Sequence, residues 1–201
     1  MKPWSKVRKY LGAASALVVI ALVAIFSTSG CRTTHPARSP IGETFPTIVG
    51  ATLAGDAVEL PPREPCVLLI GYEQEAQFDG DRWLYSLLQA DLGVRLYEVP
   101  TIPGFIPSLA SRWIDSGMRS GIPKEDWTSV VTVYGSKAEP IAVFTGNEST
   151  RNMRVLFLDA DGRVRWMHDR GFSAAKLVEV AARVRETASG AAADPSRPRQ
   201  D

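Results

Sequence analysis

The side chains best suited to chemistry are two cysteines, Cys31 and Cys66, beside only two histidines, His35 and His168. A cysteine thiolate attacks peroxides and disulfides, and it binds soft metal ions. Two cysteines are too few for a disulfide scaffold, and two histidines add little toward a zinc site. The chain has no Gly-x-Ser-x-Gly nucleophile motif and no glycine-rich phosphate loop. We therefore predict no metal and no other cofactor, and the only candidate catalytic group is a thiol.

Cys66 directly follows Pro65 and begins a solid apolar run that continues through residues 67–71. An apolar run without alternation is typical of a strand that is buried on both faces of a sheet. At the start of such a strand, a free cysteine is expected to pack as a small apolar side chain. The alternative is a reactive or partner-linking thiol, which needs exposure and a lowered pKa.

The first 30 residues carry four basic side chains and no acidic one. Residues 11–26 form an apolar run that only Gly12 and Ser15 interrupt. This order is the pattern of a secretory signal. The run of about 16 residues is shorter than the roughly 20 that a membrane-spanning helix needs, which favours a cleaved signal over a permanent span.

Residues 28–31 (Thr-Ser-Gly-Cys) resemble a bacterial lipobox, with threonine where that motif usually has leucine. The resemblance implies that residues 1–30 are a signal peptide and that Cys31 becomes an acylated first residue, with fatty acids such as palmitate. Arg32 follows Cys31 where an aspartate would mark the other sorting route, so the implied location is the periplasmic face of the cell envelope, with the outer membrane favoured. The alternatives are an uncleaved anchor and plain secretion.

The net charge excludes one class of partner. The full chain has a formal net charge of +1, from 23 basic and 22 acidic residues. Removal of residues 1–30 leaves 19 basic and 22 acidic residues, a net charge of −3. Such a surface has no general attraction for nucleic acid or anionic lipid, so we predict no nucleic-acid partner. The lipid on Cys31, rather than the protein surface, would hold the domain to the membrane.

Composition divides the chain after residue 30 into three parts. Residues 31–44 are polar and interrupted by prolines, which indicates a flexible lipidated tether with no role for His35. Residues 189–201 are rich in Ala, Pro, Arg and Asp, which indicates a disordered tail. The folded domain is then predicted over residues 45–188, a length that can bury one core.

Apolar patterning and turn residues predict the strands. Residues 48–60 are expected to form a hairpin around Gly55-Asp56, and residues 154–167 form a second around Asp161-Gly162. Single strands are expected between them. Their ranges are 67–71, 94–99 and 130–134, with 141–144 as a further candidate.

Helical spacing predicts three helices. Asp79 or Asp81 would cap the first, and Gly93 would end it. The second would begin within residues 103–107, and Ser173 would cap the third. The expected buried faces are Trp83, Leu84, Leu87, Leu88 and Leu92 in the first helix, Leu109, Trp113 and Ile114 in the second, and Leu177, Val178, Ala181 and Val184 in the third.

This order of a hairpin, strand–helix–strand–helix, a second hairpin and a final helix resembles the thioredoxin-like superfamily, in the larger form of peroxiredoxins and extracytoplasmic thiol proteins. Residues 45–61, which begin Phe-Pro and end Leu-Pro, are similar to an opening phrase of that superfamily. Residues 155–164 (Val-Leu-Phe-Leu-Asp-Ala-Asp-Gly-Arg-Val) are similar to its late hairpin. The resemblance covers most of residues 45–188 and implies an α/β fold, a thioredoxin-like three-layer α/β/α sandwich with a mixed central sheet.

In that superfamily the working thiols lie just after the central strand, where the dipole of the next helix lowers a thiol's pKa. Here residues 72–79 contain no cysteine, and Asn152-Met153 stands where the superfamily has a cis-proline. The resemblance therefore implies the fold without the redox chemistry. The alternative is a one-cysteine peroxiredoxin-like thiol reductase that uses Cys66.

Open α/β sheets usually bind ligands at the carboxyl ends of their central strands and in the loops that follow. We therefore predict a binding rim at that edge, and the alternative is that these residues are ordinary loops and caps. The candidate rim residues are Tyr72, Gln74, Gln77, Arg82, Thr101, Pro103, Asn152 and Met153.

Together these observations predict a membrane-anchored bacterial envelope lipoprotein with a redox-inactive thioredoxin-like domain. Its expected role is that of a binding or assembly factor with an envelope protein as partner. The Cys66 reductase remains the alternative and requires an exposed thiol. A small-ligand sensor is a third hypothesis, and it requires a deep apolar pocket beside Tyr72.

Overall fold

The computed structural model describes residues 34–104 and 108–192, so the predicted signal peptide, Cys31 and residues 193–201 lie outside it. Within the described residues, no helix has both the length and the apolar character needed to cross a membrane. The described helices are α2 (Gln77–Ala90), α3 (Ser108–Gly121), α4 (Glu139–Thr145) and α5 (Ala174–Ala192), with short 3-10 helices η1 (Gln74–Ala76), η2 (Lys124–Asp126) and η3 (Gly135–Lys137).

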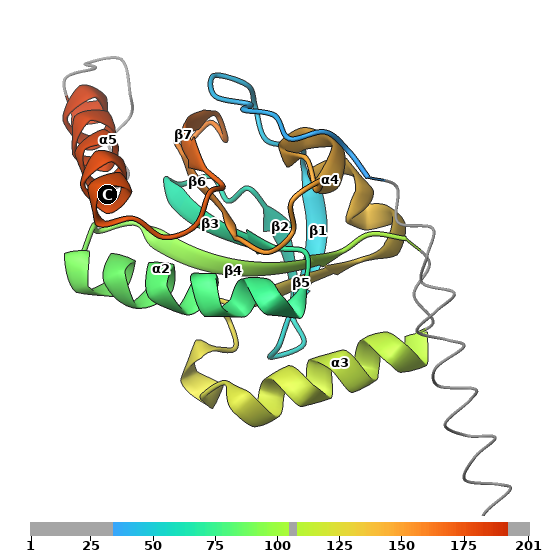
Figure 1. The fold of residues 1–201 in the computed structure, drawn as a ribbon. Helices are drawn as coiled ribbons and strands as arrows, with labels where there is room; N and C mark the ends of the chain where they lie inside the picture. Colours follow the sequence, from blue (N-terminus) through green and yellow to red (C-terminus); the bar gives the residue numbers. More distant parts are fainter. Residues whose placement is uncertain (1–33, 105–107, 193–201) are drawn as a thin grey trace, which may run out of the picture. The chain divides into compact units, whose positions relative to one another are not determined.

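Seven strands form one mixed sheet in the order β2-β1-β5-β4-β3-β6-β7 (Figure 1). The strands are β1 (Ile48–Thr52), β2 (Ala57–Leu60), β3 (Cys66–Gly71), β4 (Arg95–Ile102), β5 (Val131–Tyr134), β6 (Arg154–Leu158) and β7 (Val164–His168). β3 pairs in parallel with β4 and antiparallel with β6, and β4 pairs in parallel with β5. The antiparallel hairpins β1–β2 and β6–β7 form the two ends of the sheet, which confirms both predicted hairpins.

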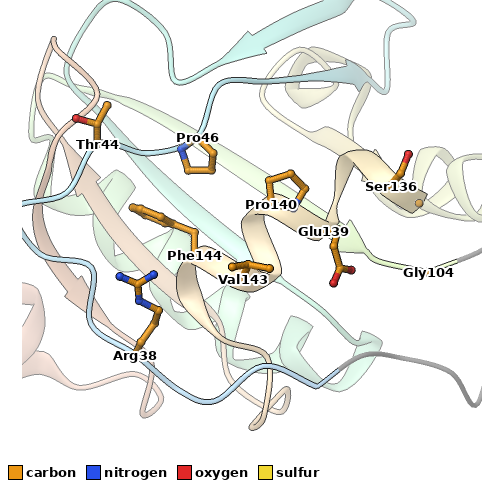
Figure 2. A pocket seen from close by; sticks show the side chains of 10 residues that line it. Arg38, Thr44, Pro46, Gly104, Ser136, Glu139, Pro140, Val143 and Phe144 are labelled. Atoms are coloured by element: carbon orange, nitrogen blue, oxygen red, sulfur yellow. The ribbon is translucent and has the colours of Figure 1, made fainter.

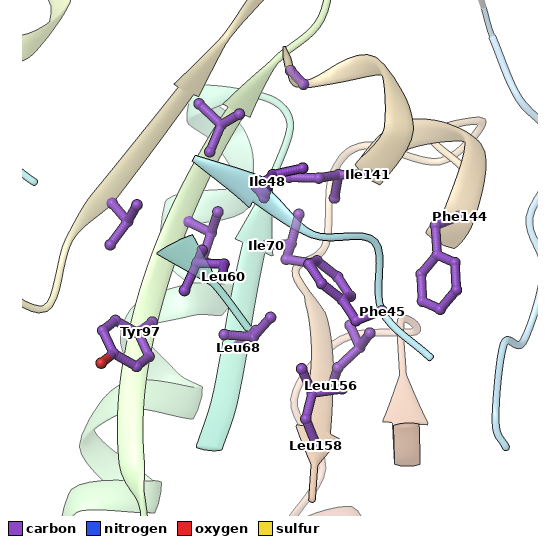
Figure 3. Packing of buried hydrophobic residues seen from close by; sticks show 14 of the residues in the cluster. Phe45, Ile48, Leu60, Leu68, Ile70, Tyr97, Ile141, Phe144, Leu156 and Leu158 are labelled. Carbon is purple, nitrogen blue, oxygen red and sulfur yellow. The ribbon is translucent and has the colours of Figure 1, made fainter. Parts of the chain in front are cut away.

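β3 lies at the centre of the fold, and all six of its residues are buried. Successive side chains of a strand point to opposite faces, so β3 contributes to two separate apolar clusters. Cys66, Leu68 and Ile70 pack in the cluster that includes α4 (Figure 3). Val67 and Leu69 pack in the cluster that includes α2 and α5. Helices cover both faces of β3, which explains why its sequence is apolar without alternation, and the fold is the predicted mixed α/β sandwich.

The boundaries of α2 differ from the predicted ones. The helix begins at Gln77, directly after η1, and its N-cap residue makes no side-chain capping bond. The extra turn of η1 moves the helix start upstream, so Asp79 is a buried residue of the first turn and not a cap. The helix ends before Asp91, which takes the left-handed conformation (φ +41°) that was predicted for Gly93.

Residues 141–144, the further strand candidate, are helical and belong to α4. Pro140 lies in the first turn of the helix, where its missing N–H breaks no helical hydrogen bond. Ile141, Ala142 and Phe144 are buried at helical spacing, whereas Val143 is 47% exposed. A short apolar run does not by itself distinguish a strand from a buried turn of helix, and here the preceding proline is the distinguishing residue.

α5 buries a face that includes Val180, Ala181 and Val184. The prediction was wrong for Val178, which is 68% exposed, because the packed stripe lies over Val180 instead. The helix continues to Ala192 and therefore includes the first residues of the segment predicted as a disordered tail.

α3 does not bury the face predicted for it. Leu109 is 79% exposed and Trp113 is 73% exposed, and neither apolar cluster includes a residue of α3. Two polar contacts connect the helix to the rest of the domain. Tyr134 Oη donates to Asp115 Oδ1 at 2.6 Å, and Arg119 Nε donates to the carbonyl oxygen of Leu53 at 2.7 Å. The predicted apolar face is therefore split, since Leu109 and Trp113 are exposed whereas Ile114 is half-buried.

Residues 34–44, predicted as a flexible tether, are packed against the domain. The backbone N–H of His35 donates to Asn147 Oδ1 at 2.6 Å, and the N–H of Asn147 donates to the His35 carbonyl at 3.1 Å. Residues 42–43 exchange two further backbone hydrogen bonds with Val164, at 2.8 and 2.9 Å. The polar groups of this segment bond to the folded domain, which composition alone does not reveal.

Gly146→Ala is expected to release this segment. Gly146 has a φ of +72°, and a Cβ there would lie 2.3 Å from the carbonyl oxygen of Pro36. We expect a loss of about 2 kcal/mol in the free energy of unfolding, together with faster tryptic cleavage after Arg38. Gly93→Ala is the matched control, since Gly93 has a φ of +68° and nothing within 4 Å of its added Cβ. Equal cleavage rates in the two variants would contradict the expectation.

Candidate functional site

Cys66 is the first residue of β3, at the opposite end of the strand from residues 72–79. Its side chain is fully buried among apolar neighbours. Burial, and to a lesser degree the carboxylate of Glu64, raises the pKa of the Cys66 thiol to about 12. A thiol that stays protonated at neutral pH lacks the thiolate that attacks peroxides and disulfides.

The predicted rim contains both exposed and buried residues. Gln74, Gln77 and Arg82 are exposed, and Asn152 is half-buried. The other four predicted rim residues are buried, so their side chains are not on the surface where the rim was expected. These buried rim residues are Tyr72, Thr101, Pro103 and Met153.

Tyr72, Thr145 and Arg154 form a buried polar cluster beneath the rim. The Tyr72 hydroxyl lies 2.7 Å from Thr145 Oγ1, and the Arg154 guanidinium lies over the Tyr72 ring, 5.1 Å from its centroid. Arg154 Nε donates to the Gly146 carbonyl at 3.0 Å, and Nη1 donates to the Asn152 carbonyl at 3.1 Å. Burial raises the pKa of Tyr72 to about 12 and lowers the pKa of Arg154. The cluster bonds to the protein's own oxygens and ties α4 to β6.

Asp79 is a buried carboxylate that sequence reasoning mistook for a helix cap. Its Oδ2 accepts a hydrogen bond from the N–H of Met153 at 3.0 Å, and its Oδ1 accepts one from the N–H of Phe172 at 2.6 Å. Two distant segments are thereby fixed to the first turn of α2. The sequence could have predicted the burial of Asp79. It lies one helical turn before Trp83, and therefore on the same, buried face of the helix.

Asn152-Met153, which by resemblance stand at the place of the superfamily's cis-proline, include a buried side chain, that of Met153. A Cβ added to Gly80 would lie 2.4 Å from Met153 Cε, and one added to Gly71 would lie 3.0 Å from Met153 Sδ. The thioether therefore occupies the space at the carboxyl end of β3. Across the part of the chain that the structure describes, a cis peptide bond occurs only at Leu60-Pro61.

The structure has an open groove of about 880 Å³ on the outer side of α4 (Figure 2). Its apolar lining comes from Pro46, Pro140, Val143 and Phe144. Tyr72 is not among the lining residues, so the hypothesis of a pocket beside it is corrected: its ring is buried under Arg154. Sequence reasoning missed this groove because one wall is residues 38–46, most of which were assigned to a flexible tether.

Charged side chains lie at the edges of the groove. The guanidinium of Arg38 lies 5.7 Å from the centroid of the Phe144 ring and pairs with the carboxylate of Glu43. Glu139 Oε1 lies 2.7 Å from His35 Nε2. The groove thus combines an apolar floor with a polar edge, which is the usual composition of a binding site. Among residues 34–104 and 108–192, no group of three or more metal-ligating side chains comes together.

The fold and this geometry place the chain in one structural class. Solved structures with the same fold include a thiol peroxidase from Chromobacterium violaceum, at 12% identity over 78% of this chain and 95% of that chain, with a TM-score of 0.50. ScoI of Arabidopsis thaliana with copper bound matches at 10% identity over 71% of this chain and 99% of that chain, with a TM-score of 0.51.

A third structure of the same fold is BsSco, a member of the Sco family of cytochrome c oxidase assembly proteins. It matches at 10% identity over 76% of this chain and 97% of that chain, with a TM-score of 0.50. No family model matches the sequence, and no curated protein does. At these identities the likeness is one of fold, and the domain is thioredoxin-like, as the sequence predicted.

Proposed function

We propose that this protein is a lipid-anchored envelope protein whose thioredoxin-like domain binds a protein partner and does not catalyse thiol chemistry. The observation that carries the proposal is the state of Cys66, which is fully buried and has a thiol pKa raised to about 12. The lipobox-like residues 28–31 support the anchor.

The carboxyl end of β3 supports the same proposal. The superfamily has its reactive thiol just after the central strand. At that end of β3 this domain has the buried hydroxyl of Tyr72, the hydrogen-bonded carboxylate of Asp79 and the packed thioether of Met153. None of these groups is a thiol, and a thiolate is the nucleophile that cleaves a disulfide or reduces a peroxide in catalysis. The groove on α4 is the proposed binding surface, and its proline and phenylalanine floor fits an extended segment of a partner protein with apolar side chains. That the fold also occurs in an assembly protein of the Sco family agrees with this role.

The reactivity of Cys66 tests this proposal. In a Cys31→Ser chain Cys66 is the sole thiol. Because its pKa is raised from 9.0 to about 12, the folded chain should hold about a thousandfold less thiolate than the unfolded chain near pH 8. We therefore expect alkylation to be correspondingly slower in buffer than in urea, with no consumption of peroxide.

The same experiment has a result that rejects the proposal. Rapid alkylation of the folded Cys31→Ser chain, together with peroxide turnover that is lost in a Cys31→Ser/Cys66→Ala chain, would establish the one-cysteine thiol reductase instead. Mass spectrometry of the wild-type chain from bacterial membranes tests the anchor separately. We expect a mature chain that begins at Cys31 and carries acyl groups.

A further inference from the structure

We propose that the apolar face of α3, formed by Leu109 and Trp113, rests in the surface layer of the membrane to which the chain is anchored. This inference rests on the lipid anchor at Cys31 proposed above. It adds a second contact between the domain and the bilayer, and it gives the domain a fixed orientation. It does not depend on which partner the domain binds.

The face consists of two large apolar side chains that no part of the described structure covers. Leu109 and Trp113 are four residues apart, so they lie one above the other on the same side of the helix. They are 79% and 73% exposed. On the domain side of α3, Asp115 and Arg119 make polar contacts beside the half-buried side chains of Ile114 and Met118. A helix that turns two large apolar side chains away from its own domain can place them in a membrane surface.

The position of the anchor brings this end of the domain to the bilayer. His35 is the fourth residue after Cys31, and four fully extended residue steps span about 14 Å. His35 is bonded to Glu139 at the start of α4 and to Asn147, two residues after the end of the helix. A lipid on Cys31 therefore holds α4 within about that distance of the membrane surface.

α3 begins at the same end of the domain. Gly104, at the carboxyl end of β4, lines the α4 groove together with Arg38 and Glu139. The chain reaches the first residue of α3 only four residues later, at Ser108. Figure 1 shows the start of α3 and the end of β4 at the same end of the sheet. The first turns of α3 are therefore close to the anchored end, and Leu109 and Trp113 are in these turns.

The chemistry of the face selects a lipid surface. Tryptophan and leucine are residues that enter the interface between headgroups and acyl chains, where the indole N–H stays in the polar layer. Electrostatic attraction contributes little, because the mature chain has a net charge of −3. The contact is therefore apolar, and it should be insensitive to salt and to the content of anionic lipid.

Fluorescence quenching by brominated lipid tests the inference on the full acylated chain. The chain is reconstituted into phosphatidylethanolamine–phosphatidylglycerol vesicles with or without bromine on the acyl chains. We expect bromine to quench part of the tryptophan emission, and we expect Trp113→Phe to lose most of that quenching. Trp127→Phe is the matched control and should keep it, because Trp127 is half-buried and its Nε1 donates to the Ile122 carbonyl. Leu109→Glu, which retains Trp113, should lower the quenching as well.

The outcomes separate this inference from the proposed function. Equal quenching of the wild-type chain and Trp113→Phe, with acyl groups present on Cys31, would overturn the membrane contact of α3 and leave the anchor intact. Its exposed face would then be assigned to a protein partner. A chain without acyl groups on Cys31 would overturn the anchor and, with it, this inference.

Discussion

Replacing Asp79 with alanine is expected to lower the free energy of unfolding by about 3 kcal/mol, because it leaves one buried and one partly buried backbone N–H group without an acceptor. The groups belong to Met153 and Phe172, which donate to the two carboxylate oxygens at 3.0 and 2.6 Å. Water does not readily replace the carboxylate, since Asp79 is only 8% exposed. The variant should also loosen Met153 and the start of α5 relative to α2.

Urea unfolding followed by tryptophan fluorescence measures this effect. The emission reports on the region directly, because the Trp83 ring lies 5.2 Å from the Phe172 ring. Asp81→Ala is the matched control on the same helix. The Asp81 carboxylate accepts an exposed hydrogen bond from Gln77, so its replacement should lower the free energy of unfolding by less than about 1 kcal/mol. If the two variants unfold at the same urea concentration, Asp79 does not have the structural role assigned to it.

Raising the pH above 9 is expected to destabilise the wild-type chain more than a Cys66→Ala chain. The thiol has a pKa of 9.0 without burial and about 12 in the folded protein. The unfolded chain therefore releases the thiol proton first. The stability linked to that proton is complete below pH 9.0 and is lost as the pH rises toward 12. At roughly 1.4 kcal/mol for each pKa unit, the wild-type chain should lose about 2 kcal/mol more than Cys66→Ala between about pH 8 and about pH 10.5.

The comparison of the two chains isolates the thiol. The pKa of Tyr72 is raised from 10.0 to about 12, so its hydroxyl adds a similar loss of stability above pH 10. That loss occurs in both chains and cancels in the difference. Urea midpoints measured at half-unit steps of pH would give two curves that diverge from pH 9. Parallel curves would show that Cys66 is accessible to water in the folded state, and the argument against thiol chemistry would fall.

The sequence predicted the framework of the fold from strong local patterns. The unbroken apolar run of β3 required cover on both faces, and the turns at Gly55-Asp56 and Asp161-Gly162 required hairpins. The sequence was less informative where the same pattern is compatible with two different structures. Residues 141–144 are too few to show a helical period, and the amphipathic pattern of α3 shows that one side is apolar but not which way that side faces.

The candidate site was predictable only in part. The lack of a thiol in residues 72–79 and the presence of Asn152-Met153 where the resemblance implies a cis-proline were visible in the sequence. Which groups occupy that space was not visible, because Asp79 and Met153 meet only through the fold and are 74 residues apart. The α4 groove was hidden for a related reason. Its wall is a proline-containing segment whose polar atoms bond to residues of the folded domain such as Glu139, Asn147 and Val164, and composition cannot distinguish that from a free chain.

The docking of residues 34–44 gives the domain a mechanical property. A force applied at residue 34 acts first on the hydrogen bonds of His35. The hydrogen bonds of Gly42 and Glu43 with Val164 bear the force only after those of His35 have broken. Bonds that break in turn yield at lower force than a sheet whose strands are sheared together. The segment would therefore peel off before the core is strained, and its eleven or so residues would lengthen the domain's reach from its anchor by up to about 35 Å.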